Sequence, residues 1–486
     1  MSPKQLVRPK AVSTPQDREP VTNKASGLRG NLGVASIVSI VVAAASPLGV
    51  IGGPVPLGIA SGNGAGFPFS FVIATLVLLL FAVGFTQMTR FVPTAGAFYS
   101  YVGKGLGRGP GLGAAFVALL AYLALEAGVF GLFGPGLGEL VQSYGGPDLP
   151  WWLWVFVGFI VVTVLGYRNI ALSGNLLAVL LIAEVVIVLV LDAVVIFSGG
   201  GPEGFARGIV TPTQILSGAP GVGILFAILS FVGFEATAVF RDEVKDPERT
   251  IPRATYISLL TIGAFYTVSS WVLISANGES DIVARMAQDP GTILQTTTQT
   301  YLGAAGGHIV QLLFVTSLFA CILSFHNIVS RYLFQLGARG VLIAKLGQAH
   351  PRLAAPSNAS LVASGIVAIL LLCAVVLRLE PITQFYTWLG GISSVGVVLL
   401  LTLTSVAVLT YFVREERGGP VWQRLVAPAL GLVGLISFLT VILLNLPTLV
   451  GESSYGPFSV GVLSLLAIAL LTGPVLARRR PSSVLD

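Results

Sequence analysis

Four acidic side chains lie within stretches of sequence that are otherwise apolar: Glu126, Glu184, Asp192 and Glu235. An ionised group in such surroundings costs several kcal/mol or more, so each of them needs a compensating partner or a function. A carboxylate in this position can bind a cation, hold a proton or accept backbone N–H groups. We therefore take Glu126, Glu184 and Glu235 as candidate proton-binding groups, and Glu235 also as a candidate cation ligand.

The stretches around these carboxylates are long enough to cross a membrane. Of 486 residues, 54% are hydrophobic and 10% charged, and the mean hydropathy is +0.89. A bilayer core about 30 Å thick takes roughly 20 apolar residues per helix. The runs are continuously apolar and do not alternate, which favours helices over a barrel. The sequence predicts an all-α polytopic membrane protein with twelve spans, near residues 33–60, 68–89, 112–140, 151–167, 172–198, 217–240, 252–276, 306–336, 358–378, 384–413, 424–446 and 457–477.

The distribution of basic residues predicts the orientation of these spans. Segments expected outside hold only Arg207, Arg285 and Arg378 of the 27 Lys and Arg residues. This bias places both termini in the cytoplasm of a multi-pass protein of the cell membrane. Residues 1–26 are predicted to form a disordered cytoplasmic tail, and 479–486 a short one. The basic charge therefore reflects topology and gives no reason to expect a nucleic-acid partner.

Two of the spans contain clusters of helix breakers, ASPLGVIGGP at 45–54 and SFVGFE at 230–235. They lie five spans apart and in opposite orientation, which predicts an inverted repeat of residues 33–198 and 217–413, followed by two extra helices at 424–477. A helix broken inside a membrane exposes backbone polar groups, which is tolerated only beside a cavity or a ligand. The connections at 90–109 and 277–305 are expected to contain short helices.

Three motifs stand out along the chain: GFEATAVFRDEVKDPERTIPRA (233–254), VPTAGAFYSYVGKGLG (92–107) and SRYLFQLGARGVLIAKLGQAHPRLAAPSNA (330–359). Together they resemble the signatures of the amino acid-polyamine-organocation permeases. Arg339 replaces the acidic residue usual in the third motif. The resemblance covers about residues 30–478 and implies one transporter domain at 27–478 with the leucine-transporter type of fold, working by alternating access.

The resemblance also implies where a substrate would bind. In this family, amides at the first break receive the carboxylate of an amino acid, and carbonyls at both breaks receive its ammonium group. Pro47 has no N–H to offer a carboxylate, which keeps carboxylate-free amines open as substrates. Leu229 stands where similar arginine/agmatine antiporters carry a tryptophan, so stacking on a guanidinium is not expected. The substrate-binding candidates are Ala45, Ser46, Pro47, Leu48, Gly49, Ser230, Phe231, Gly233, Phe234 and Glu235.

Further roles are predicted for residues around this site. Glu184 lies about where proton-coupled relatives carry a lysine that replaces a sodium ion. His326 is expected to be a satisfied core histidine, and Asp192 and Glu139 to reach water near the outer boundary. The charged loop after the second break has the spacing of ion pairs that could latch one conformation. Its gate candidates are Asp242, Glu243, Lys245, Arg249 and Arg253.

The leading hypothesis is a proton-coupled importer of an amino acid. The alternatives are a permease or exchanger of amines or polyamines and, more remotely, a channel or a non-transporting sensor. An enzyme is not expected, because no nucleophile and base stand at a motif spacing. The two cysteines, Cys321 and Cys373, are read as small core residues. No metal site and no cofactor are predicted; the partners are a small molecule, protons and lipid, and the oligomeric state stays open.

Overall fold

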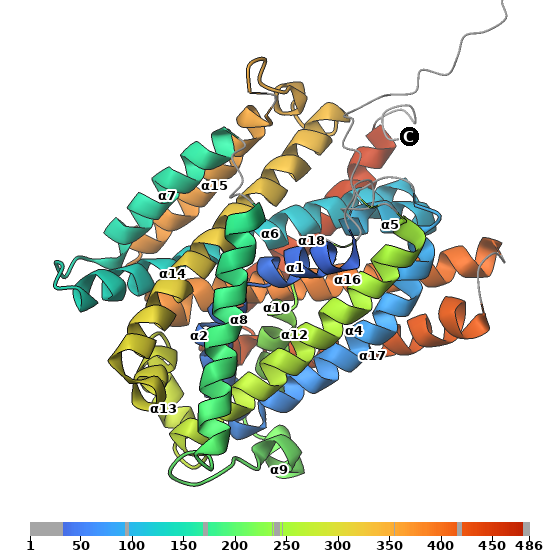
Figure 1. The fold of residues 1–486 in the computed structure, drawn as a ribbon. Coiled ribbons are helices and arrows are strands. Elements are labelled where there is room, and N and C mark those ends of the chain that lie inside the picture. Colours follow the sequence, from blue (N-terminus) through green and yellow to red (C-terminus); the bar gives the residue numbers. More distant parts are fainter. Residues whose placement is uncertain are drawn as a thin grey trace, which may run out of the picture.

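The computed structural model describes residues 33–92, 97–168, 174–235, 246–353, 355–415 and 420–479, together with Thr237 and Val244. Within these ranges the regular structure is almost entirely helical, and an isolated bridge pairs Gly201 with Gly204. Figure 1 shows the helices crossing one another around the middle of the molecule. The all-α class is thus confirmed for the described residues. The tails predicted at 1–26 and beyond 479 lie outside them.

Nine helices of the described ranges are long and apolar enough to cross a membrane, and two shorter apolar helices, α7 (Trp151–Tyr167) and α10 (Pro220–Leu229), accompany them. The exact count of twelve spans stays a prediction. The nine are α4 (Pro68–Thr89), α6 (Arg108–Ser143), α8 (Gly174–Phe197), α12 (Pro247–Asn277), α14 (Ile293–Ala338), α15 (Ser357–Val376), α16 (Thr387–Glu415) with the π-helical turn η6 (Pro381–Tyr386), α17 (Ala427–Leu449) with η7 (Trp422–Val426), and α18 (Pro457–Arg479).

The first predicted span is broken where its sequence predicts a break. α1 (Val34–Ala44) ends before Ser46, which has the left-handed conformation (φ 50°, ψ 69°), and α2 (Pro47–Gly52) begins at Pro47. A proline disfavours the helical conformation for the residue before it but is well placed at the first position of a helix. Non-helical Gly53 then separates α2 from α3 (Pro54–Gly58).

The second predicted break is also present. α10 ends at Leu229, and residues 230–235 form turns. Gly233 has a φ of 111°, a conformation that glycine adopts without the steric cost other residues meet. Beyond Glu235 only Thr237 of the predicted span is described, so the other half of this helix lies outside the described residues.

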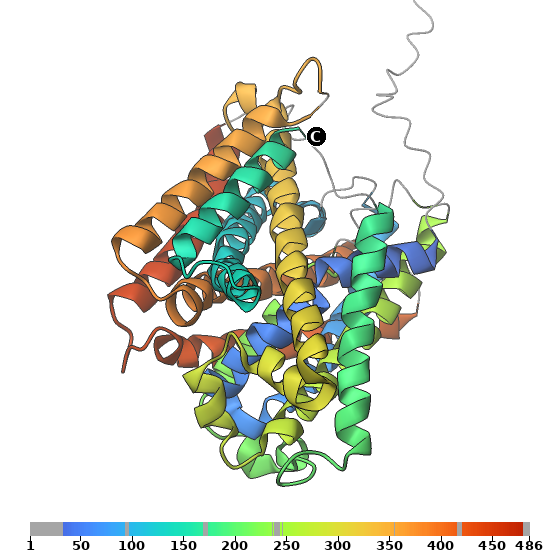
Figure 2. The same ribbon diagram turned by 60° about the vertical axis from the view of Figure 1, so that its left-hand side comes forward.

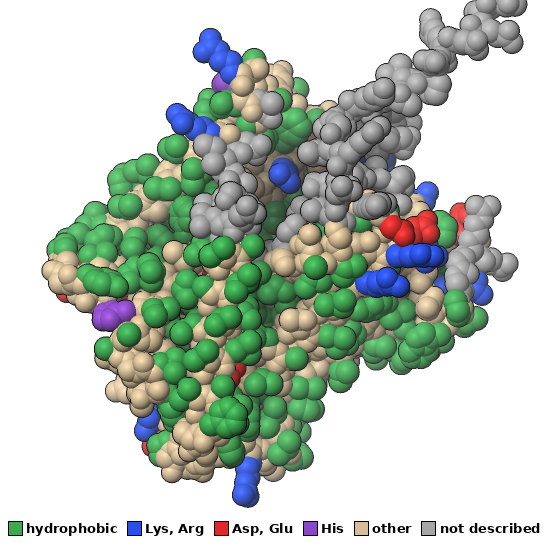
Figure 3. All heavy atoms as spheres, in the orientation of Figure 1, with side chains coloured by type: hydrophobic (Ala, Val, Ile, Leu, Met, Phe, Trp, Pro, Cys, Tyr) green, Lys and Arg blue, Asp and Glu red, His purple; other side chains and the backbone are tan. Residues whose placement is uncertain are grey.

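α6 is the most deeply buried of the spans and packs against α14, α16 and α18, whereas α18 is the least buried. Figure 2 shows α8 standing beside α14, and these two helices are in contact. Hydrophobic side chains cover much of the face in Figure 3, with Lys and Arg mainly toward its upper and right-hand edges. Phe156 on α7 and Ile182 on α8 are among the exposed apolar side chains, which suit contact with lipid.

The two connections expected to contain short helices do so, with α5 (Ala97–Leu106) in the first and α13 (Ile282–Gln288) in the second. The internal symmetry of the two halves and the domain limits stay predictions. What the fold provides for function is two interrupted helices, α1–α2 and α10, packed inside a bundle of membrane-length helices.

Candidate functional site

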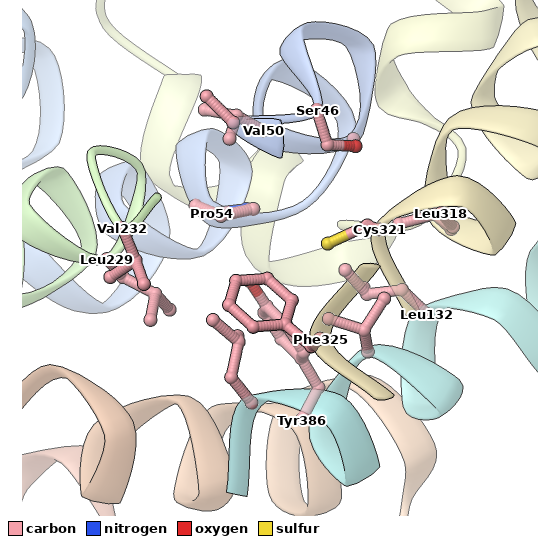
Figure 4. Close-up of a pocket in the computed structure, with 14 residues that line it drawn as sticks. Ser46, Val50, Pro54, Leu132, Leu229, Val232, Leu318, Cys321, Phe325 and Tyr386 are labelled. Atoms are coloured by element: carbon pink, nitrogen blue, oxygen red, sulfur yellow. The ribbon is translucent and has the colours of Figure 1, made fainter. Parts of the chain in front are cut away.

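The two helix breaks border one cavity, and all the residues that line it are buried. Figure 4 shows Leu229 and Val232 entering from one side and Leu132, Leu318 and Cys321 from the other. The side chains and backbone around it come from both breaks, α2, α3, α6, α14 and η6. The lining residues are Ala45, Ser46, Gly49, Val50, Pro54, Leu125, Val129, Leu132, Leu229, Val232, Leu318, Cys321, Phe325 and Tyr386.

Part of the predicted substrate site lies in this wall. Ala45, Ser46 and Gly49 line the cavity. The other candidates do not: Pro47, Leu48, Ser230, Phe231, Gly233, Phe234 and Glu235. From the second break, it is Leu229 and Val232 that face the cavity.

Sequence reasoning missed the walls that α6 and α14 contribute. Leu125, Val129 and Leu132 follow one another at helical spacing on one face of α6. Leu318, Cys321 and Phe325 do the same on α14, and no motif marks either set. A spacing of this kind is a usable signal only when the opposite face of the helix is polar, and here both faces are apolar.

Close approach at the first break depends on glycine. A Cβ atom at Gly49 would lie 2.4 Å from Ser46 Oγ and 3.3 Å from Leu318 Cδ2. The backbone of α2 therefore borders the cavity directly. Helix geometry leaves the N–H groups of a first turn without intrahelical partners, and Gly49, the third residue of α2, lines the cavity.

Glu184 connects α8 and α14 to the first break. Its Oε2 accepts a hydrogen bond from Ser317 Oγ at 2.7 Å and a longer one from the Leu48 N–H at 3.5 Å. Ser317 Oγ also lies 2.7 Å from Ser46 Oγ. Since Ser46 lines the cavity, this carboxylate is linked to the cavity wall through two hydrogen bonds. Glu184 itself is buried.

Glu235 ties the second break to α6. Its Oε1 accepts a hydrogen bond from Tyr122 Oη at 2.5 Å, and its Oε2 accepts the Gly233 N–H at 2.9 Å. Both oxygens thus have partners within the protein, and neither lies in the cavity wall. These hydrogen bonds fit a role in which Glu235 holds the broken backbone, and its predicted roles as a proton-binding group and cation ligand stay predictions.

Glu126 and His326 form a buried pair outside the cavity. His326 Nδ1 lies 2.7 Å from Glu126 Oε1, and His326 Nε2 lies 2.9 Å from Ser360 Oγ, linking α14 to α6 and α15. Both members of the pair have 1% side-chain exposure. A Cβ atom at Gly166 of α7 would lie 2.3 Å from His326 Cδ2, so the ring packs directly against that backbone. His326 is the satisfied core histidine that was expected.

Asp192 and Glu139, the two carboxylates expected to reach water, differ from each other in burial. Asp192 is buried and accepts a hydrogen bond from Ser269 Oγ at 2.6 Å, so it does not extend to solvent in this structure. Ser269 of α12 supplies a partner that the sequence of α8 alone does not reveal. Glu139 is half-buried, and its Oε2 accepts a hydrogen bond from Gln311 Nε2 at 3.2 Å.

The gate candidates are described only in part. Asp242, Glu243 and Lys245 lie outside the described residues. Arg249 Nε lies 3.9 Å from Asp246 Oδ2 at the start of α12, and these side chains are 79% and 53% exposed. Arg253 is exposed on the same helix. The gating role of this segment stays a prediction.

We expect Arg249→Ala to change the turnover of transport by no more than about twofold. An exposed ion pair contributes only about 0.3–0.5 kcal/mol, which corresponds to roughly a twofold shift between two conformations. Initial uptake rates in proteoliposomes at saturating substrate measure this. A tenfold loss of rate, with the variant still folded, would mean that Arg249 has a stronger partner in another conformation.

Membrane-length helices with two backbone breaks at a buried cavity form the architecture of a secondary transporter. The sequence pattern of the amino acid permease family matches residues 32–469, and the chain belongs to this family. Because the family consists of permeases, the protein is a multi-pass membrane permease.

Individual relatives are distant. The low-affinity putrescine importer PlaP of Escherichia coli is 24% identical over 374 residues, covering 74% of this chain and 77% of PlaP. The branched-chain amino acid permease BcaP of Lactococcus lactis is 24% identical over 398 residues, covering 76% and 81%. The aromatic amino acid transport protein AroP of Escherichia coli is 27% identical over 237 residues, covering 47% and 51%.

A solved structure shows the same fold. The manganese transporter of Eremococcus coleocola superposes with a TM-score of 0.58 over 91% of this chain and 95% of its own, at 14% sequence identity. At this identity the likeness concerns the fold alone. It agrees with the leucine-transporter type of architecture that the motifs imply.

Proposed function

We propose that the protein imports an amino acid across the cell membrane by alternating access, coupled to proton movement. The observation that carries this proposal is the shared cavity, where Ala45, Ser46 and Gly49 of the first break face Leu229 and Val232 of the second. Broken helices supply backbone donors and acceptors at such a place. The names of BcaP and AroP, which describe amino acid transport, support the same class of substrate.

The polar ends of an amino acid have candidate partners in this wall. Its carboxylate would lie beside Ser46 Oγ and the Gly49 N–H, which removes the need for a donor at Pro47. Its ammonium group would lie toward the carbonyls at the end of α10, near Leu229, where the helix carries partial negative charge. The carboxylate and the ammonium group of one bound substrate would then contact both breaks and so connect the two halves of the bundle.

Glu184 is the best-placed of the three proton-binding candidates. As a carboxylate it accepts a hydrogen bond from the Ser317 hydroxyl, and as a carboxylic acid it would donate a hydrogen bond to Ser317 Oγ instead. The Ser317 hydroxyl hydrogen would then be free to be donated to Ser46 Oγ. Its protonation state therefore changes the hydrogen bonding of a residue in the cavity wall. Glu235 already has both oxygens engaged, and the Glu126–His326 pair is electrically neutral when it holds a single proton.

Counterflow in proteoliposomes tests the proposed function. Internal unlabelled amino acid should accelerate uptake of the same labelled amino acid, which neither a channel nor a sensor would show. The decarboxylated amine of that amino acid should compete poorly, because it lacks the group that Ser46 and Gly49 would hold. Equal competition by the amine favours the second candidate, an amine or polyamine permease, which the resemblance to PlaP and the proline at position 47 support.

A further inference from the structure

The cavity wall contains very few polar side chains. Ser46, Cys321 and Tyr386 carry the only side-chain heteroatoms among its 14 residues. The other lining residues are Ala, Gly, Val, Leu, Pro and Phe, and the wall as described contains no Asp, Glu, Lys, Arg or His. The substrate's side chain therefore meets hydrocarbon and aromatic surfaces over most of its contact area.

We propose that the substrate of this site is an amino acid with an apolar side chain, such as leucine, isoleucine, valine or phenylalanine, and that diamines are poor substrates. The proposal rests on the proposed function and specifies its substrate class. It also separates the two substrate classes that the sequence leaves open. An importer of apolar amino acids needs an apolar wall here, whereas a polyamine importer needs a counter-charge for a second ammonium group.

The wall that would surround the substrate side chain comes from three helices. Leu125, Val129 and Leu132 of α6 form one surface, and Leu318 and Phe325 of α14 form another. Leu229, at the end of α10, stands across the cavity from Leu132 and Leu318 in Figure 4. Burial of apolar area against such a surface is favourable for a hydrocarbon side chain and offers no hydrogen-bond partner to a polar one.

The buried carboxylates do not supply the missing charge for a second ammonium group. Glu235 accepts hydrogen bonds from Tyr122 and the Gly233 N–H, and it lies outside the wall. Glu184 accepts its hydrogen bonds behind Ser46, from Ser317 and Leu48. The distal ammonium of a diamine or of lysine would therefore enter an apolar space without a counter-charge, which is strongly unfavourable.

In the proposed pose the hydroxyl of Ser46 lies beside the substrate carboxylate, and it also lies 2.7 Å from Ser317 Oγ. With both of these partners it has little hydrogen-bonding capacity left for a polar substrate side chain. The remaining polar side chains of the wall are Cys321 and Tyr386, and the thiol of Cys321 is only a weak hydrogen-bond partner. A substrate hydroxyl would therefore meet at most the Tyr386 phenol, whereas a methyl group of the same size fits the rest of the wall.

Competition in proteoliposomes tests this substrate class, with valine and threonine as a nearly isosteric pair. Unlabelled valine should inhibit uptake of labelled leucine at a concentration at least about tenfold lower than threonine, within the range that apolar pockets achieve. Leucine and phenylalanine should inhibit as well, and lysine and putrescine should not. Inhibition by threonine, lysine or putrescine as strong as that by valine would overturn the proposal.

Val129→Thr provides the matched variant, because it adds one hydroxyl to the wall at constant size. It should reduce the preference for valine over threonine by about tenfold. Val117→Thr is the control, since Val117 is buried on the same helix but does not line the cavity. The preference of this variant for valine over threonine should equal that of the unmodified protein. An equal effect of the two substitutions, or none from Val129→Thr, would contradict the assigned wall.

The outcomes distinguish this proposal from the function on which it rests. Counterflow with polar or basic amino acids alone would overturn the apolar substrate class and leave an amino acid importer. Counterflow with putrescine alone would overturn both the substrate class and the amino acid, leaving an amine permease. Absence of counterflow with all amino acids and amines would overturn the proposed function itself.

Discussion

Glu184→Gln is expected to abolish the accumulation of substrate that an inward proton gradient drives, while counterflow without a gradient persists. Glutamine matches the size of the carboxylic acid and can still hydrogen-bond Ser317, but it cannot release a proton. The hydrogen bonds from residue 184 through Ser317 to Ser46 would then no longer change with protonation. We expect accumulation to fall at least about tenfold, to the level reached by exchange alone, measured as labelled uptake with and without a pH gradient.

Asp192→Asn is the control for this prediction. Asp192 is a second buried carboxylate on α8; it accepts a hydrogen bond from Ser269, and neither residue lines the proposed substrate cavity. Its replacement should leave gradient-driven accumulation within about twofold of the unmodified protein. If Glu184→Gln still accumulates substrate against a gradient, Glu184 is not the coupling residue and the Glu235 or Glu126 sites become the candidates.

His326→Leu is expected to cost about 3–5 kcal/mol of stability, because it leaves the Glu126 carboxylate buried without its partner. The same substitution also removes the hydrogen bond to Ser360. Thermal unfolding in detergent should show a large drop in apparent Tm. Substrate recognition should be affected less than stability, since the pair lies outside the cavity wall.

The double variant His326→Leu with Glu126→Leu separates loss of the pair from loss of packing. Replacing a whole buried ion pair by apolar residues is often neutral or stabilising, so the second substitution should restore most of the apparent Tm. Such non-additivity is the signature of two residues in one interaction. Additive losses from the two substitutions would mean that the pair does not couple α6 to α14.

Local backbone features were predictable from the sequence, because proline and glycine act on their immediate neighbours. The break at Ser46 and Pro47 and the end of α10 before Gly233 both occur where helix breakers cluster. The helices in the two long connections follow from the same kind of local pattern. Symmetry between the two halves depends on the arrangement of whole helices, which a local pattern cannot establish.

Partners of the buried carboxylates were not predictable. Tyr122 and Glu235 are 113 positions apart, Glu184 and Ser317 are 133 apart, and Glu126 and His326 are 200 apart. No local spacing relates such residues. The cavity wall was equally hidden, because in a helix that is apolar on all sides the residues facing a cavity have the same types as those facing lipid.

The cavity as substrate site is tested most directly by the reactivity of Cys321, which lies in its wall. In a Cys373→Ser background, where Cys321 is the remaining cysteine, the rate of alkylation by a small maleimide reports access to the cavity during the transport cycle. Cys321→Ser in the same background provides the blank. Saturating leucine is predicted to slow alkylation of Cys321 by about tenfold or more, and putrescine to leave it unchanged. An unchanged rate in the presence of an amino acid that the protein demonstrably transports would contradict the assignment of this cavity as the binding site.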